Sequence, residues 1–169
     1  VSYKWNSDNT VLVMKTRKNV FWSDGTPFSA EDVAFTTQIK KKFKALDTRN
    51  SWEYLDQVTA INDSLVQYKF NRVNVPGFDA LATQAIVPKH IWEKVEDPVK
   101  FLNPNPVGTG PFTEILRFDN QIWELGKNQN YWQKGKPYVE KLVFPTFPSN
   151  EQVTLALNSG KLDWAGAFI

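Results

Sequence analysis

Two helix-start signals with strand-like runs between them limit most strongly what this chain can fold into. In Ser29-Ala30-Glu31-Asp32 and again in Ser149-Asn150-Glu151-Gln152, a serine stands three residues before an acid or an amide. In such a capping box the serine accepts a backbone N–H of the first helical turn, and the later side chain accepts the N–H of the serine. The sequence therefore predicts helices that start near Ser29 and Ser149. The first should bury an apolar stripe at helical spacing, made of Phe35, Ile39, Phe43 and Leu46.

Runs of apolar and β-branched residues predict strands between and around these helices. The expected strands cover residues 11–16, a pair within 57–70, and three further strands at 112–118, 121–127 and 138–144. A short helix is expected over 78–84, an edge strand or strand-to-helix junction at 86–92, and a buried strand at 162–168. Because strands and helices are mixed along the chain, the predicted fold class is α/β or mixed α+β.

Composition excludes several kinds of protein. Of the 169 residues, 41% are apolar and 22% are charged, which is typical of a globular chain and too apolar for intrinsic disorder. The net charge of +2 gives no concentrated basic face, so no nucleic-acid partner is predicted. The chain has no Cys and one His, which excludes thiolate chemistry and leaves little room for a metal site.

The clearest change in composition falls at residues 97–106, where Pro98, Pro104 and Pro106 stand among asparagines. Proline and asparagine interrupt regular structure, so this stretch is the best candidate for a domain boundary or crossover. The chain opens with VSYKWNSDNT, without an initiator Met or leader, and closes with the apolar run DWAGAFI. We interpret the sequence as an internal fragment of a longer protein.

No constellation of catalytic residues is visible. The Gly108-Thr109-Gly110 segment lacks the lysine and the spacing of a phosphate-binding loop, and Pro111 removes an N–H that a phosphate would need. The acidic residues at 31–32 fit helix capping, and His90 is expected to be a packed or capping residue. The sequence therefore predicts no catalytic residues, no metal ligands and no cofactor.

The high content of aromatic residues is the sequence feature that points most directly to a function, namely binding. The chain has 7 Trp, 5 Tyr and 12 Phe with few catalytic residue types, a combination that fits a protein binding by stacking and shape. Tryptophan rings can stack on the apolar faces of sugar rings or on peptide side chains, and many of them build cores instead. The sequence alone leaves open which of them are exposed.

Four motifs then occur in order along the chain. They are residues 21–33 (FWSDGTPFSAEDV), 107–112 (VGTGPF), 128–132 (NQNYW) and 156–163 (ALNSGKLD). In this order they resemble the signatures of extracytoplasmic solute-binding proteins of ABC transporters, in the oligopeptide/dipeptide-binding family. Gln129 and Lys161 depart from the usual proline and acid. The ending at 163–169, with Val75-Pro76-Gly77-Phe78 upstream, looks like the subgroup linked with β-linked oligosaccharides.

The resemblance implies a fragment of a bilobed periplasmic-binding-protein type II fold. Residues 1–106 would form the family-specific extra domain and 107–169 part of the ligand-facing N-terminal lobe, with the C-terminal lobe absent. The implied function is substrate capture for an ABC import system, with an oligopeptide or oligosaccharide bound and not chemically changed. The implied partner is a membrane permease, and the implied location is periplasmic or at the cell surface.

Three aromatic residues are the predicted ligand contacts: Trp52, Trp164 and Phe168. Trp52 follows a polar loop, and loops between elements often carry binding groups. Trp164 and Phe168 lie in the segment that resembles a cleft-entering strand. Two other functions stay open, a carbohydrate-active enzyme domain and a sensor or scaffold domain on the same fold. An enzyme of the first kind would need an opposed carboxylate pair, and none is visible.

Overall fold

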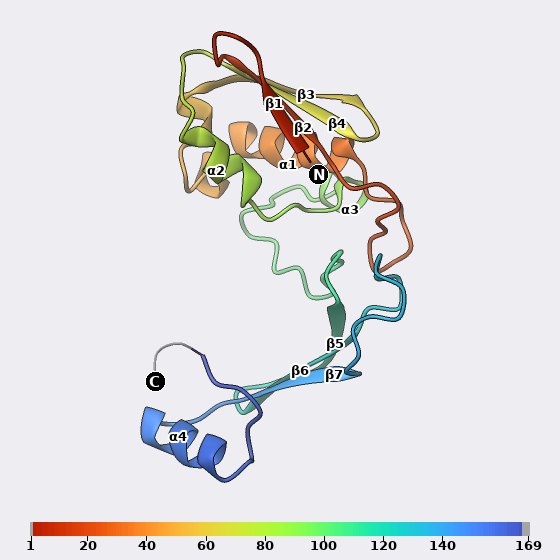
Figure 1. The fold of residues 1–169 in the computed structure, drawn as a ribbon, viewed down its shortest axis with the longest axis vertical. Coiled ribbons are helices and arrows are strands. Elements are labelled where there is room, and N and C mark those ends of the chain that lie inside the picture. Colours follow the sequence, from red (N-terminus) through yellow and green to blue (C-terminus); the bar gives the residue numbers. More distant parts are fainter. Residues whose placement is uncertain (1, 167–169) are drawn as a thin grey trace.

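The computed structural model describes residues 2–166, which form two units one after the other along the chain (Figure 1). The N-terminal unit, residues 2–92, holds a four-stranded antiparallel sheet in the order β1-β2-β4-β3. The C-terminal unit, residues 112–158, holds a three-stranded antiparallel sheet in the order β5-β6-β7. The N-terminal unit comprises β1 (Ser2–Trp5), β2 (Val11–Lys15), α1 (Ala30–Lys42), η1 (Lys44–Leu46), η2 (Ser51–Glu53), β3 (Leu55–Asn62), β4 (Leu65–Phe70), α2 (Gly77–Ala82) and α3 (Lys89–Trp92). The C-terminal unit comprises β5 (Phe112–Phe118), β6 (Ile122–Lys127), β7 (Lys141–Pro145) and α4 (Asn150–Asn158).

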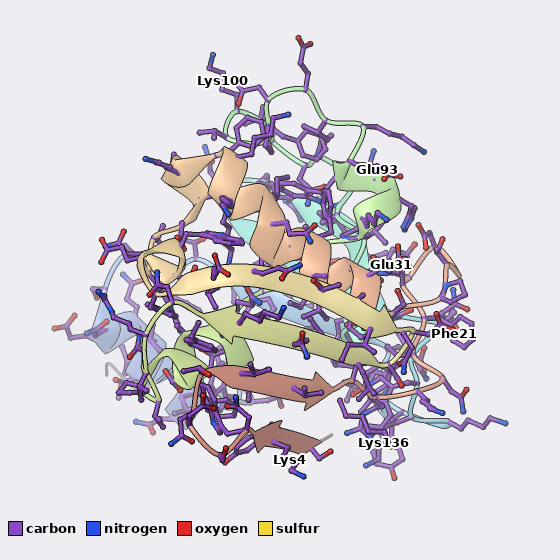
Figure 2. The ribbon with its side chains drawn as sticks, turned by 90° about the horizontal axis from the view of Figure 1, so that it is seen from above. Lys4, Phe21, Glu31, Glu93, Lys100 and Lys136 are labelled. Carbon is purple, nitrogen blue, oxygen red and sulfur yellow. The ribbon has the colours of Figure 1, made fainter. Side chains whose placement is uncertain are left out.

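The core of the molecule lies between the four-stranded sheet and helix α1, which packs against β3 and β4 (Figure 2). Alternate residues of β4, namely Val66, Tyr68 and Phe70, point to this side, as expected for a sheet with one buried face. Ala30, Val33 and Ala34 of α1 meet them, and small residues there allow the helix to approach the sheet closely. The buried cluster consists of Leu12, Ala30, Val33, Ala34, Tyr54, Leu55, Val58, Val66, Tyr68, Phe70 and Leu81.

Both predicted helix starts are confirmed. Ser29 caps α1 through its side chain, which accepts the Glu31 N–H at 3.2 Å, and Asp32 accepts the Ser29 N–H at 2.9 Å. Ser149 caps α4 by accepting the Gln152 N–H at 3.4 Å. The reciprocal contact of a capping box is therefore seen for α1 at the edge of a packed core.

The predicted apolar stripe of α1 is wrong in detail. Phe35, Ile39, Phe43 and Leu46 are only half-buried, whereas the buried residues of the helix are Ala30, Asp32, Val33, Ala34, Thr36 and Thr37. Thr36 and Thr37 satisfy their hydroxyls on backbone carbonyls one turn earlier, Asp32 O at 2.8 Å and Val33 O at 3.2 Å. These threonines are thus buried without an unpaired polar group.

The second sheet exposes a row of aromatic rings. Trp123 of β6 pairs with Phe118 of β5 and Phe144 of β7, so the three side chains share one face. The ring centroids are 6.2 Å apart for Phe118 and Trp123 and 5.3 Å apart for Trp123 and Phe144. The side chains are 76%, 40% and 37% exposed, in the order Phe118, Trp123, Phe144. We call these three residues the aromatic row.

Two other expectations need correction. Within the described part of predicted strand 162–168, residues 162–166 form no strand and are largely exposed, because no neighbouring strand lies there to pair with them. Residues 86–92 form neither an edge strand nor a strand-to-helix junction, because residues 84–88 are not a strand and α3 begins directly after Pro88. Strand β1 was not predicted from the sequence.

In the described residues, no helix has the length and apolarity needed to cross a membrane.

Candidate functional site

A polar hollow of about 270 Å³ lies between the end of α1 and the end of α2, and we call it the α1–α2 hollow. The loop that joins α1 to β3 forms one wall, and the last turn of α2 with the residues after it forms the other. The lining residues are Lys40, Leu46, Asp47, Thr48, Arg49, Ser51, Ala80, Thr83, Gln84 and Ala85.

Two cations reach this hollow. The half-buried Lys40 donates from Nζ to Gln84 Oε1 at 2.7 Å, and Arg49 donates from Nη1 to Thr83 Oγ1 at 2.6 Å. Burial lowers the pKa of Lys40, the Asp47 carboxylate partly reverses this, and the Arg49 guanidinium adds to the fall. The hollow therefore holds an ammonium, a guanidinium and the Asp47 carboxylate together with neutral polar groups.

Asp47 organises the loop around these cations. Its carboxylate accepts the backbone N–H groups of Ser51 and Trp52, each at 3.0 Å, and the Ser51 hydroxyl. Asn50 takes a left-handed conformation at φ 51°, which asparagine tolerates better than most residues. The result is a tight turn that places Trp52 beside the hollow.

Trp52, the first predicted contact, is half-buried and already engaged. Its indole Nε1 donates to the Thr37 carbonyl at 2.8 Å, and the Lys41 ammonium lies 4.5 Å from the ring centroid. The indole N–H is thus occupied within the unit, and Lys41 covers a face of the ring by a cation–π contact. Contact with a ligand would use the remaining ring edge or would displace Lys41.

The other two predicted contacts lie elsewhere. Trp164 follows α4 in the C-terminal part of the chain and is 72% exposed, and Phe168 lies outside the described residues. The structure thus places Trp52 and Trp164 in different units (Figure 1). Their role as ligand contacts stays a prediction.

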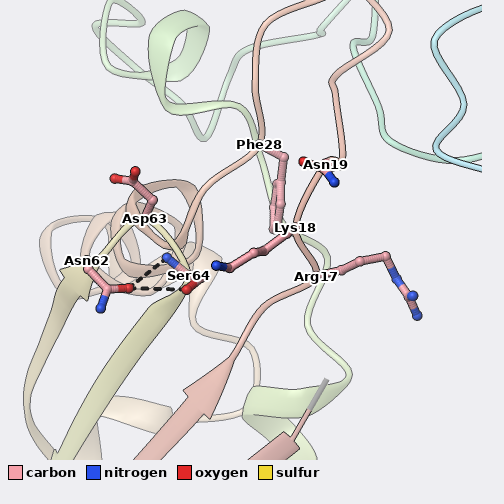
Figure 3. A pocket seen from close by; sticks show the side chains of 7 residues that line it. All are labelled: Arg17, Lys18, Asn19, Phe28, Asn62, Asp63 and Ser64. Carbon is pink, nitrogen blue, oxygen red and sulfur yellow. Dashed lines mark hydrogen bonds between the residues drawn. The ribbon is translucent and has the colours of Figure 1, made fainter.

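A larger pocket of about 440 Å³ lies where the chain leaves β2, beside the turn between β3 and β4 (Figure 3). Lys18 extends toward Ser64, and Arg17 points away from that turn (Figure 3). The Arg17 guanidinium lies 4.0 Å from the centroid of the Trp132 ring. Ser64 donates its N–H to Asn62 Oδ1 at 3.0 Å. The lining residues are Arg17, Lys18, Asn19, Phe28, Asn62, Asp63 and Ser64.

Both pockets are lined by polar and charged groups that suit the binding of a ligand. Among residues 2–166 no cluster of three or more His, Asp or Glu could hold a metal ion. His90 pairs through Nε2 with Asp24 Oδ2 at 2.7 Å, which ties α3 to the loop before α1. The pockets present hydrogen-bond donors, charges and aromatic surface, and these groups can bind and orient a ligand.

Sequence reasoning missed the residues of the α1–α2 hollow. A run of lysines at the end of a helix is typical of a solvated helix end, which fits the exposed Lys41, Lys42 and Lys44 but not the half-buried Lys40. No local signal distinguishes Lys40 from its neighbours, because its burial depends on α2, which follows two strands later in the chain.

The comparison with known protein families shows which family this chain belongs to. Residues 1–169 match the family described as bacterial extracellular solute-binding proteins, family 5 Middle. The chain belongs to this family. Its resemblance to ABC-transporter solute-binding proteins, first suggested by four short motifs, is thereby confirmed.

Relatives and solved structures agree with this assignment. The chain is 28% identical over 160 residues to the oligopeptide-binding protein AppA of Bacillus subtilis, covering 89% of this chain and 29% of that protein. It superposes with a TM-score of 0.89 and 30% identity on a mannohexaose-bound periplasmic oligopeptide-binding protein of an oligopeptide ABC transporter from Thermotoga maritima, covering 99% of this chain and 32% of that one. NikZ from Campylobacter jejuni in complex with Ni(L-His) gives a TM-score of 0.76 at 25% identity, covering 96% and 33%.

The chain therefore spans about a third of the length of the relatives it matches. The predicted mixed helix-and-sheet class, as a fragment of the type II binding-protein fold, is confirmed by these superpositions. The matched relatives are named as binding proteins, and their family is described as extracellular.

Proposed function

We propose that this chain is part of the substrate-capturing receptor of an ABC import system, which binds a small oligomer without changing it chemically. The observation that carries the proposal is the match to a solute-binding family along the full chain. The polar and aromatic hollows support it, since they offer binding groups in place of a nucleophile with a base. The proposed location is extracytoplasmic, and the proposed partner is a membrane permease.

The ligand class we propose is an oligopeptide or a β-linked oligosaccharide. The relatives support both, since one is named an oligopeptide-binding protein and another, with the same kind of name, holds mannohexaose. The α1–α2 hollow suits the carboxylate of a peptide through Lys40 and Arg49. Exposed aromatic rings such as Trp164 suit the stacking of a sugar.

We also propose how the chain divides. Residues 1–106 would be the extra domain beside the N-terminal lobe, and residues 107–169 would be part of the ligand-facing lobe. The two separate sheets, one before residue 71 and one after residue 111, support this division. Trp52 would contact ligand from the first part, and Trp164 and Phe168 from the second.

Ligand binding by this chain and by a receptor of its relatives' length tests the proposal. Ligand sites of small molecules bury about 70–90% of the ligand surface, so a third of a receptor offers only part of the walls. We expect the longer receptor to bind short oligopeptides or mannohexaose in isothermal titration, and the 169-residue chain to bind them much more weakly or not at all. Equal affinity of both proteins would place the whole site within this chain, and a receptor that binds neither class would refute the proposed function.

Variants of the longer receptor test the proposed contacts. Replacement Trp164→Ala should weaken binding about tenfold or more, because a stacked ring of this size contributes well over 1 kcal/mol. The matched control is Tyr138→Ala, which removes another exposed ring outside the proposed contacts. Equal affinity of the Trp164→Ala variant and the unmodified receptor would remove Trp164 from the site.

A further inference from the structure

Three of the four family-like motifs meet at one place in the structure. Ser23 of the first motif lies against Gly108 of the second and Asn130 of the third, although 85 and 107 residues separate the partners along the chain. The contact lies between the two units, where the loop before α1 reaches the segments that flank the second sheet (Figure 1). We call Trp22, Ser23, Asp24, Gly108 and Asn130 the Ser23 joint.

Ser23 uses its backbone and its side chain in this contact. Its N–H donates to the Gly108 carbonyl at 2.9 Å, and its hydroxyl oxygen accepts the Gly108 N–H at 3.3 Å. Its carbonyl accepts from Asn130 Nδ2 at 2.9 Å. One residue of the N-terminal unit therefore holds two separate segments that border the C-terminal sheet.

The loop that carries Ser23 is itself fastened to the N-terminal unit. The indole N–H of Trp22 donates to Asp32 at 3.4 Å, and Asp24 pairs with His90 of α3 at 2.7 Å. The Thr26 N–H donates to Asp24 Oδ1 at 2.9 Å, and Gly25 supplies the positive φ of 87° that the turn needs. The loop is thus a braced turn and not a loose connection.

The partner segments are fastened in the same way on the other side. Buried Asn128 donates from Nδ2 to the Gly110 carbonyl at 2.8 Å and accepts the Asn130 N–H on its Oδ1 at 2.9 Å. Its own N–H donates to the Pro111 carbonyl at 2.9 Å. The segment before β5 and the segment after β6 are therefore joined to each other before Ser23 binds both.

We infer that the Ser23 joint sets the orientation of the C-terminal sheet relative to the N-terminal unit, with Ser23 and Asn130 as positioning residues. A hydrogen-bonded contact with braced groups on both sides transmits orientation, whereas a contact between free loops would not. The cation–π contact between Arg17 and Trp132 is a second contact between the N-terminal unit and the C-terminal unit. This inference concerns the geometry of the chain and does not depend on the ligand proposed above.

Distance measurements between spin labels test this inference in the 169-residue chain. The chain has no native Cys, so Thr59→Cys in β3 and Gln121→Cys before β6 place labels only at these two exposed sites. Double electron–electron resonance should give one narrow distance distribution in this background. Asn130→Asp places a carboxylate oxygen against the Ser23 carbonyl and should raise the population of other orientations at least fivefold, the effect of one lost hydrogen bond.

The matched control is Gln129→Glu, which makes the same change of amide to acid at the preceding exposed residue. A second label pair at Asp8→Cys and Thr59→Cys reports distances within the N-terminal unit, and it should stay unchanged in every variant. If Asn130→Asp also alters this pair, the milder Asn130→Ala replaces it as the test variant. The inference would be overturned if the distances between the labels at positions 59 and 121 stay narrowly distributed in the test variant and also in the variant that combines it with Arg17→Ala.

Discussion

Tyr68 brings a hydroxyl into the centre of the core without a partner. Its side chain is fully buried, and its oxygen is one of two buried side-chain polar atoms in the described residues that make no hydrogen bond. Burial raises the pKa of Tyr68 from 10.0 to about 12, although the neighbouring Thr37 and Gln84 side chains lower it in part. Such a group lowers stability, because water no longer solvates it and the nearby Thr37 and Gln84 side chains form no well-aligned hydrogen bond to it.

Replacement Tyr68→Phe should therefore stabilise the fold. We expect the free energy of unfolding in urea to rise by about 1 kcal/mol at neutral pH. The unmodified chain should also lose stability as the pH rises from about 10 to about 12, because the folded state holds the phenol proton that the unfolded state releases. The variant should lose less over the same range. Tyr3→Phe at an exposed position is the control, and a lower stability of Tyr68→Phe than of this control would contradict the argument.

Asp32 is the opposite case, a buried carboxylate whose oxygens are all used. Oδ1 accepts the Lys89 N–H at 2.9 Å, and Oδ2 accepts the Ser29 N–H at 2.9 Å and the Trp22 indole N–H at 3.4 Å. Asp32→Ala leaves these three donors without an acceptor and should lower the free energy of unfolding by about 3 kcal/mol. Glu31→Ala, which breaks only the exposed ion pair with Lys89, should cost far less in the same urea titration. If both variants lost similar amounts of unfolding free energy, water would be replacing the Asp32 oxygens as the acceptor for these donors.

At the scale of elements, two helices that begin with the same capping signal differ in how much of their surface is buried. Helix α1 is covered by the sheet and buries six of its residues, whereas α4 buries Ala156 and leaves Leu155 and Leu157 exposed. Most of the stability of a helix comes from packing its apolar face, with propensity and capping adding smaller terms. The two caps should therefore matter to different extents.

Removal of each cap tests this difference. Ser29→Ala should lower the free energy of unfolding of the N-terminal unit by about 1 kcal/mol, because α1 is part of the core. Ser149→Ala should reduce the helical far-UV signal slightly and leave the main urea transition in place. An equal shift of the main transition in both variants would show that α4 folds together with the core.

At the scale of the whole molecule, the aromatic row and exposed residues of α4 leave the C-terminal unit with apolar surface facing solvent. Monomeric proteins rarely expose large contiguous apolar patches, and such patches promote association. The apolar run at residues 165–169 is another candidate for such a surface, but 167–169 lie outside the described residues. The aromatic row is a better-founded source of association.

We expect the 169-residue chain to self-associate as its concentration rises. The double replacement Phe118→Thr and Phe144→Thr should reduce the sedimentation coefficient at high concentration toward that of a monomer, because threonine keeps the strand propensity and removes the rings. Tyr138→Thr is the control, since this exposed ring lies outside the row. Equal association of the row variant and the control would exclude the aromatic row as the contact.

Local sequence determined most of the elements of this protein. Both capped helices, the pairing of 57–70 around a turn and the strands at 112–127 follow from capping, turn and alternation signals that act over a few residues. The family was also visible at this level, because its motifs are short and contiguous. Their number and order made the resemblance specific.

Tertiary structure alone decided burial and the joining of distant segments. Half-burial of Lys40 depends on α2, the buried face of α1 depends on how closely the sheet approaches, and residues 162–166 form no strand without a neighbour to pair with. Ser23 meets Gly108 and Asn130 only because the chain folds back across the two units. The physical reason is that propensity and capping act between residues a few positions apart. Desolvation, packing and long-range hydrogen bonds depend on groups that the sequence keeps far apart.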